Sequence, residues 1–128
     1  METKTTRGIR INVEVNYLHG ESAPMEDRYC YAYRVTIANE GNESIQVLRR
    51  HWIIKDANGE VREVEGEGIV GQQPIIDSGH AHQYVSWCPL KAAVGSMSGT
   101  YEVINLSTEE HFDVEIPSFA LIYPPLRN

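Results

Sequence analysis

The sequence predicts an all-β protein in which two antiparallel sheets pack face to face. About seven strands are expected, in a sandwich of the immunoglobulin or fibronectin type III kind. Apolar and polar residues alternate along most of the chain, which is the pattern of strands with one buried face. Turn sequences such as Asn58-Gly59 and Ser78-Gly79 interrupt the alternation at short intervals. No segment shows the period of an amphipathic helix.

Length and composition favour one soluble domain covering residues 1–128. A chain of 128 residues can bury one core without disulfides or metals, and 41% hydrophobic with 23% charged residues is typical of globular proteins. No apolar run approaches the roughly 20 residues of a membrane helix, and no apolar signal segment opens the chain, so we expect no membrane insertion and a cytoplasmic location. A net charge of −7 argues against binding of nucleic acid.

Two clear alternating patterns predict the first strands. Apolar positions from Ile9 to Tyr17 alternate with polar ones, and the same pattern recurs from Tyr29 to Ile37. Turn residues 39–42 end the second strand, and a third strand is expected to begin near Ile45.

The third strand supplies the predicted core. Leu48, Trp52 and Ile54 share one parity, so we expect all three to face the core. Arg50 has the same parity. The first interpretation of Arg50 is a buried aliphatic stem with its guanidinium at the rim, and the alternative is a ligand-binding arginine. The turn at Asn58-Gly59 then predicts a hairpin into a strand at residues 61–64.

Three further strands complete the predicted sandwich. One is expected from Gln83 to Trp87, and the next from Gly99 to Leu106 with Tyr101 in the core. The last pattern extends over residues 112–121. Its parity changes at Pro117, which predicts a bulge or a sheet edge there.

A glycine-rich segment, Gly66–Pro74, is the most distinctive motif of the chain. Gly66, Gly68 and Gly71 match G-x-G-x-x-G, the spacing that binds pyrophosphate when a helix follows. Here Gln73 and Pro74 precede a short apolar run instead. A loop crossing between the sheets is therefore the main interpretation. A nest of amides for a phosphate or other ligand and a partner-binding loop are the alternatives.

Metal-binding and catalytic patterns are sparse. His80 and His82 would lie about 7 Å apart at their α-carbons on an extended strand, which allows weak metal binding, but two ligands are too few for a specific site. Glu63, Glu65 and Glu67 describe the solvated face of a strand.

Neither the cysteines nor the serines form a reactive pattern. Cys30 and Cys88 lack C-x-x-C spacing, so two reduced thiols are expected. No serine lies in a G-x-S-x-G elbow. We therefore predict neither an enzyme nor a cofactor.

Six separated segments occur in an order that resembles the ApaG family. They are Arg28–Asn39, Leu48–Ile54, Val64–Pro74, Tyr84–Ser86, Gly95–Glu102 and Ile116–Leu121. Two positions depart from the family pattern, which usually has small residues at Trp87-Cys88 and Pro-Gly at Ser78-Gly79.

This resemblance implies a fibronectin type III-like sandwich and a role in binding. Bacterial members are linked to cobalt and magnesium tolerance or efflux and to the gene neighbourhood of diadenosine tetraphosphate hydrolysis. Related domains at the C-terminal ends of an F-box protein and of a polymerase-delta-interacting protein imply association with other proteins.

Two functional hypotheses follow. The first is a small cytoplasmic, non-enzymatic binding module that acts on divalent-cation homeostasis indirectly, through an unidentified protein partner. Its contact surface would include the Gly66–Pro74 loop with nearby aromatic or histidine side chains, and a homodimer could form at the edge near Pro117. The alternative is a protein that binds a nucleotide or polyphosphate, with or without Mg²⁺, in that loop.

Overall fold

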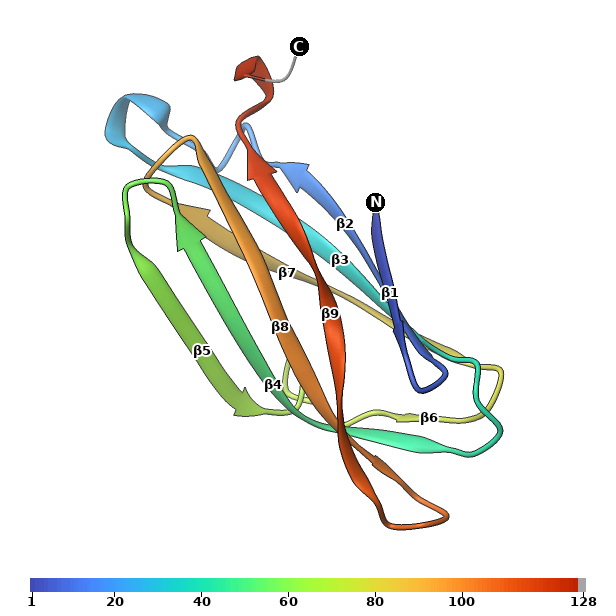
Figure 1. Cartoon of the computed structure of the whole chain (residues 1–128). Helices are drawn as coiled ribbons and strands as arrows, with labels where there is room; N and C mark the ends of the chain where they lie inside the picture. The colour runs from blue at the N-terminus through green and yellow to red at the C-terminus, as the bar shows by residue number, and fades with distance from the viewer. Residues whose placement is uncertain (127–128) are drawn as a thin grey trace.

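The computed structural model describes residues 1–126 and contains two antiparallel β-sheets packed face to face (Figure 1). The first sheet has the order β1-β2-β3-β7 and the second β5-β4-β8-β9, with β6 paired to one end of β4. The strands are β1 (Glu2–Thr6), β2 (Ile9–Tyr17), β3 (Tyr29–Asn39), β4 (Ile45–Asp56), β5 (Val61–Glu67), β6 (Ile75–Ile76), β7 (Ala81–Leu90), β8 (Val94–Asn105) and β9 (His111–Ile122). Two short 3-10 helices are present: η1 (Pro24–Glu26) lies between β2 and β3, and η2 (Pro124–Leu126) follows β9.

The all-β class is confirmed, but residues 1–126 contain nine strands rather than about seven. The additional strands are β1 and β6. Every residue of β1 is polar, so it lacks the alternation that identifies a half-buried strand. β6 has only two residues, too few for any pattern. Both are held by pairing with longer neighbours, β2 and β4.

Trp52 lies at the centre of the core between the sheets. Its side chain is 3% exposed, and edge-to-face contacts join its ring to Tyr33 at 5.3 Å, to Phe119 at 6.0 Å and to Tyr101 at 6.2 Å between centroids. Tyr101 and Ile54 are buried as well. The aromatic cluster therefore links β3 of one sheet with β4, β8 and β9 of the other.

The prediction that Leu48 faces the core is wrong. The register of β4 against β8 shifts between Val47 and Arg49, so Leu48 is the additional residue of a β-bulge and is only half-buried. Before the bulge the buried residues have odd numbers, as at Ile45 and Val47, and beyond it they have even numbers, as at Trp52. One added residue reverses which face each later side chain takes.

A second bulge lies at Pro117, where one was expected. The pairing of β8 with β9 shifts between Met97 and Gly99, opposite Pro117, and β9 is also the last strand of its sheet. Strand β1 packs along β9, where Lys4 pairs with Glu115. A homodimer through this edge would have to displace β1, and homodimerisation remains a prediction.

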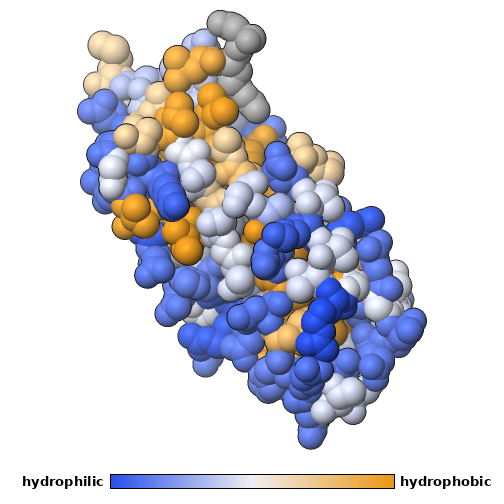
Figure 2. All heavy atoms as spheres, viewed as in Figure 1, coloured by the Kyte–Doolittle hydropathy of each residue, from blue (hydrophilic) through white to orange (hydrophobic). Residues whose placement is uncertain are grey.

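The face seen in Figure 1 is mainly hydrophilic, with separate hydrophobic patches (Figure 2). Within residues 1–126, no helix has both the length and the apolar composition needed to span a bilayer.

Candidate functional site

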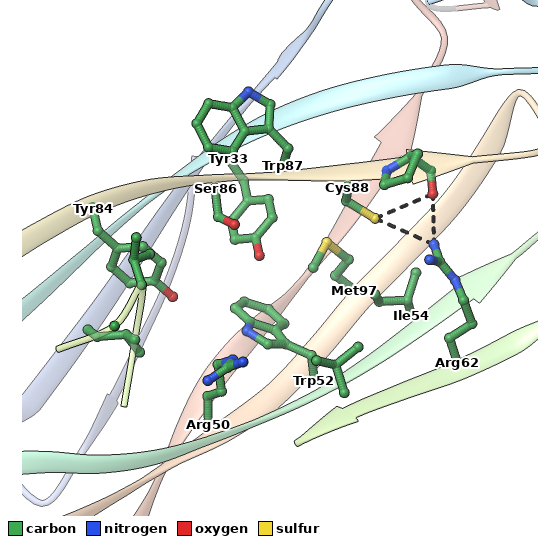
Figure 3. Close-up of a pocket in the computed structure, with 15 residues that line it drawn as sticks. Tyr33, Arg50, Trp52, Ile54, Arg62, Tyr84, Ser86, Trp87, Cys88 and Met97 are labelled. Carbon is green, nitrogen blue, oxygen red and sulfur yellow. Dashed lines mark hydrogen bonds between the residues drawn. The ribbon is translucent and has the colours of Figure 1, made fainter. Parts of the chain in front are cut away.

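A cleft opens between β5 and β7, the end strands of the two sheets, opposite the side at which β1 packs on β9. Its volume is about 360 Å³, which lies in the range of small-molecule sites. Figure 3 shows Trp52 and Arg50 on one side of this cleft, with Tyr33 and Ser86 on the other. The lining comes from β3, β4, β5, β7, β8 and the Gly66–Pro74 segment, hereafter the glycine loop.

The charged residues of the cleft are two arginines. Arg50 and Arg62 both line it, and no aspartate or glutamate of residues 1–126 does. The Nη1 group of Arg50 donates hydrogen bonds to the carbonyl oxygens of Glu67 at 3.0 Å and Gly68 at 3.1 Å. Arg62 donates through Nη2 to the carbonyl oxygen of Pro89 at 2.7 Å. Neither guanidinium forms an ion pair with a carboxylate of residues 1–126.

The three glycines of the loop differ in their local surroundings and backbone conformation. A β-carbon on Gly66 would lie 2.8 Å from the guanidinium nitrogens of Arg50, so the bare α-carbon makes room for that side chain. Gly68 has φ of +67°, and a β-carbon there would overlap the carbonyl oxygen of Gln72. Gly71 has φ of +76° but open space around it. The motif therefore shapes a loop and positions an arginine. The expected crossing between the sheets is wrong, because β5 before the loop and β6 after it both pair with β4 in the second sheet.

The tip of the glycine loop is a two-residue turn. Ile69 and Gln72 exchange backbone hydrogen bonds of 2.7 and 3.0 Å across Val70 and Gly71, both of which have positive φ. The amide of Gly68 donates to the carbonyl oxygen of Leu48 at 2.7 Å. Because the amides of Gly68, Ile69 and Gln72 are bonded within the protein, they do not form a nest for phosphate.

Gln73 and Pro74 fasten the glycine loop to β4. The Gln73 side chain donates to the carbonyl oxygen of Leu48 at 3.0 Å, and the carbonyl oxygen of Pro74 accepts the amide of Val47 at 3.0 Å. The short strand β6 follows, where a pyrophosphate site would need a helix. Both residues thus contact the bulge of β4 that the sequence pattern did not reveal.

Burial favours the neutral forms of two phenols and one thiol in and behind the wall of the cleft. The hydroxyls of Tyr84 and Tyr101 are hydrogen-bonded to each other, and burial raises the pKa of both phenols. Burial also raises the pKa of the Cys88 thiol to about 11, although Arg62 opposes this effect. Cys88 and Cys30 are both free thiols. A thiol with so high a pKa is a poor nucleophile, so Cys88 adds to the wall of the cleft without being activated.

The two histidines lie at the start of β7. His80 belongs to the turn before the strand, where its amide donates to the carbonyl oxygen of Asp77, and His82 is half-buried beside Tyr84. Within residues 1–126 no group of three or more His, Cys, Asp or Glu side chains is arranged to hold a metal ion. Glu63 and Glu65 are exposed and contact His51 instead.

Sequence reasoning missed Arg62 and Ser86 as cleft residues. Arg62 and Gly66 are both even-numbered residues of β5, so their side chains lie on the same face of the strand. Because Gly66 pairs with Arg50, this shared face would have placed Arg62 in the cleft once the pairing was known. Ser86 faces the cleft because even-numbered residues of β7 point inward, whereas Val85 and Trp87 point outward. That β7 ends its sheet is a property of the topology, which no local pattern shows.

The fold and its cleft define a small β-sandwich whose ligand-sized opening lies between two end strands. Residues 19–105 match the family model described as the ApaG domain. Protein ApaG of Brucella canis is 46% identical over 127 residues, covering 99% of this chain and 97% of that protein. For Protein ApaG of Paramagnetospirillum magneticum the identity is 44% over 124 residues, with 97% and 95% covered. This chain therefore belongs to the ApaG family, as the sequence motifs indicated.

A solved structure supports the same assignment. The crystal structure of the putative ApaA protein from Bordetella pertussis superposes with a TM-score of 0.89 at 39% identity, covering 94% of this chain and 95% of that one.

Proposed function

We propose that this ApaG-family protein is a non-enzymatic binding module that associates with another protein through strand β7. One observation carries the proposal. β7 is a ten-residue end strand without a charged residue, and it exposes Trp87 by 65% and Val85 by 40% on its outer face. Large exposed aromatic side chains are enriched where proteins bind one another.

An unprotected sheet edge favours pairing with another chain. An end strand presents unpaired N–H and C=O groups, and natural proteins protect such edges with charges, prolines, bulges or covering segments. The other three end strands carry charges: β1 has Glu2 and Lys4, β5 has three glutamates, and β9 has two acidic residues. β7 has only Pro89, near its end. A partner segment could therefore extend the first sheet by β-strand addition.

The glycine loop belongs to the same surface. Val70 at its tip is 61% exposed and lines the opening of the cleft, which β7 borders. Val70 is also a β-branched residue with φ of +46°, a strained conformation of the kind that clusters at functional sites. A segment added to β7 would thus reach the loop. The effect on cobalt and magnesium tolerance that the family resemblance implies would then be indirect, through the partner.

A charge placed on β7 tests this proposal. Val85→Lys puts an ammonium group on the edge strand, and Val61→Lys is the matched control because Val61 is 59% exposed on β5. Cross-linking in lysate of the source organism should capture the same protein with the parent and with Val61→Lys, and lose it with Val85→Lys. The free energy of unfolding of both variants should lie within about 0.5 kcal/mol of that of the parent. Equal capture by both variants would overturn the role of β7.

Sedimentation at several concentrations tests whether the partner is a second copy of the chain. A dimer that persists in Val61→Lys and is lost in Val85→Lys would identify β7 as the pairing edge. A dimer that persists in both would assign association to another surface.

A further inference from the structure

We infer that the cleft between β5 and β7 binds a small organic oxyanion, in which a carboxylate or phosphate group is attached to an apolar or aromatic body. This binding would be a second activity, independent of protein association through the outer face of β7. The inference rests on the charge of the cleft, on the way Arg50 is held, and on the aromatic wall beside it.

The charge of the cleft is opposite to that of the whole chain. The chain has 18 acidic and 11 basic residues, yet among residues 1–126 the cleft is lined by two arginines and by no aspartate or glutamate. Four arginines outside the cleft, Arg7, Arg10, Arg28 and Arg34, are each paired with a glutamate. Arginines in a partly enclosed cleft without a counter-charge attract an anion, and the low-dielectric walls strengthen that attraction.

Arg50 is held in place before any ligand arrives. Its two hydrogen bonds to the glycine loop both use Nη1, so Nη2 and Nε keep their donors for a ligand. These two groups form one side of the planar fork that binds carboxylate or phosphate through two parallel hydrogen bonds. The missing β-carbon of Gly66 lets the guanidinium lie against the β5 backbone. A guanidinium already immobilised loses less conformational entropy on binding.

The remainder of the cleft suits an apolar or aromatic body. Trp52, Met97 and Ile54 line it beyond Arg50, and the hydroxyl-bearing Ser86 and Tyr33 lie opposite (Figure 3).

Arg62 is at the other end of the cleft. It pairs with Ile54 in the register and Gly66 pairs with Arg50, so the two arginine positions are four residues, about 13 Å, apart along the strands. A ligand held by Arg50 would therefore extend over Trp52 toward Arg62.

Fluorescence of Trp52 can measure such binding. The chain has two tryptophans, so Trp87→Phe leaves Trp52 as the reporter while keeping a ring at position 87. Benzoate and phenyl phosphate are the two test anions, benzamide is the uncharged analogue of benzoate, and inorganic phosphate lacks the apolar body. At least one of the two test anions should bind saturably, at least tenfold more tightly than benzamide and inorganic phosphate. The stronger of the two identifies the anionic group. Three results would overturn the inference. They are an affinity for benzamide equal to that for both test anions, an affinity for inorganic phosphate equal to that for both test anions, and a lack of saturable binding by either test anion.

Variants of the arginines test the site itself. Arg50→Gln should weaken binding at least tenfold and Arg62→Gln, at the far end of the cleft, severalfold, whereas Arg49→Gln should change it less than twofold. Arg49 is the matched control because it neighbours Arg50 on β4 but is exposed and does not line the cleft. Equal weakening by all three variants would show general attraction rather than a site, and would refute the inference.

Gly66→Ala provides a test that keeps every charge. The added methyl group would displace the Arg50 guanidinium, the end of a flexible side chain, at a position without positive φ. Binding should fall severalfold while the circular dichroism and the unfolding midpoint stay close to those of the parent. Undiminished affinity in a folded Gly66→Ala protein would contradict the role of the held guanidinium. This variant and Arg62→Gln also decide the matter if Arg50→Gln does not fold.

Discussion

Replacing Gly68 with alanine tests whether this glycine is required by the backbone conformation of the glycine loop. Gly68 has φ of +67°, and an added β-carbon would overlap the carbonyl oxygen of Gln72. That oxygen accepts the amide of Ile69, one of the two hydrogen bonds that close the turn. The substitution therefore combines an unfavourable backbone conformation with a displaced hydrogen-bond acceptor.

The expected loss of stability follows from these parts. A left-handed conformation costs a residue with a β-carbon about 1–2 kcal/mol. Loss of the Ile69–Gln72 hydrogen bond adds about 1 kcal/mol. Displacement of the crowded backbone adds about 1–2 kcal/mol. The lower entropy of the unfolded alanine chain offsets about 0.4–1 kcal/mol. Gly68→Ala should thus reduce the free energy of unfolding by about 2–4.5 kcal/mol.

The neighbouring glycines are internal controls with smaller expected effects. Gly71 has a similar φ but open space, so Gly71→Ala should cost about 0.5–1.5 kcal/mol. Gly66 lacks positive φ and requires only that Arg50 move, so Gly66→Ala should cost less than about 1 kcal/mol. Urea unfolding followed by tryptophan fluorescence gives the three values. The reasoning is refuted if Gly71→Ala or Gly66→Ala proves the most damaging, or if added ATP stabilises the parent but not folded Gly68→Ala.

Two further predictions concern the core. Trp52→Ala should reduce the free energy of unfolding by about 3–5 kcal/mol, the usual result of truncating a buried tryptophan. Trp87→Ala should change it by about 0.5 kcal/mol or less, because Trp87 is exposed. Urea unfolding compares the two variants, and similar losses would contradict the placement of Trp52. Burial raises the pKa of Tyr84 and Tyr101, so their contribution to stability is fully present below about pH 10, the pKa of an unfolded tyrosine, and is lost as the pH rises through the folded pKa. Stability should fall above about pH 10, and tyrosinate absorbance should show these two phenols ionising only with unfolding.

Alternation along the sequence predicted most of the strands but not all of their faces. Seven expected strands correspond to β2, β3, β4, β5, β7, β8 and β9. Most of them alternate apolar and polar residues, whereas β5 was indicated by the turn at Asn58-Gly59 rather than by an apolar face. β8 begins five residues earlier than expected, at Val94, because Gly95, Ser96 and Ser98 weaken the pattern around Met97. The parity of β4 could not be followed through Leu48, since adjacent apolar residues leave open where a bulge lies.

The candidate site could be predicted only in part, because local sequence patterns do not show register or strand order. The glycines were found because their spacing is local, and so was the inward parity of Arg50. The contact between Gly66 and the Arg50 guanidinium was not predicted, because it depends on the register of β5 against β4. The open edge of β7 likewise depends on the order of strands in the sheet.

The bulge at Leu48 connects the core, the glycine loop and the cleft. Without the additional residue, the odd-numbered parity of Ile45 would continue, and Trp52 and Arg50 would face outward. The bulge also leaves the carbonyl oxygen of Leu48 to accept the amide of Gly68 and the side chain of Gln73, which anchors the glycine loop. That loop in turn supplies the carbonyl oxygens that hold Arg50. The glycine motif and the third strand therefore act as one unit, because a single insertion turns the arginine inward and anchors the loop that holds it.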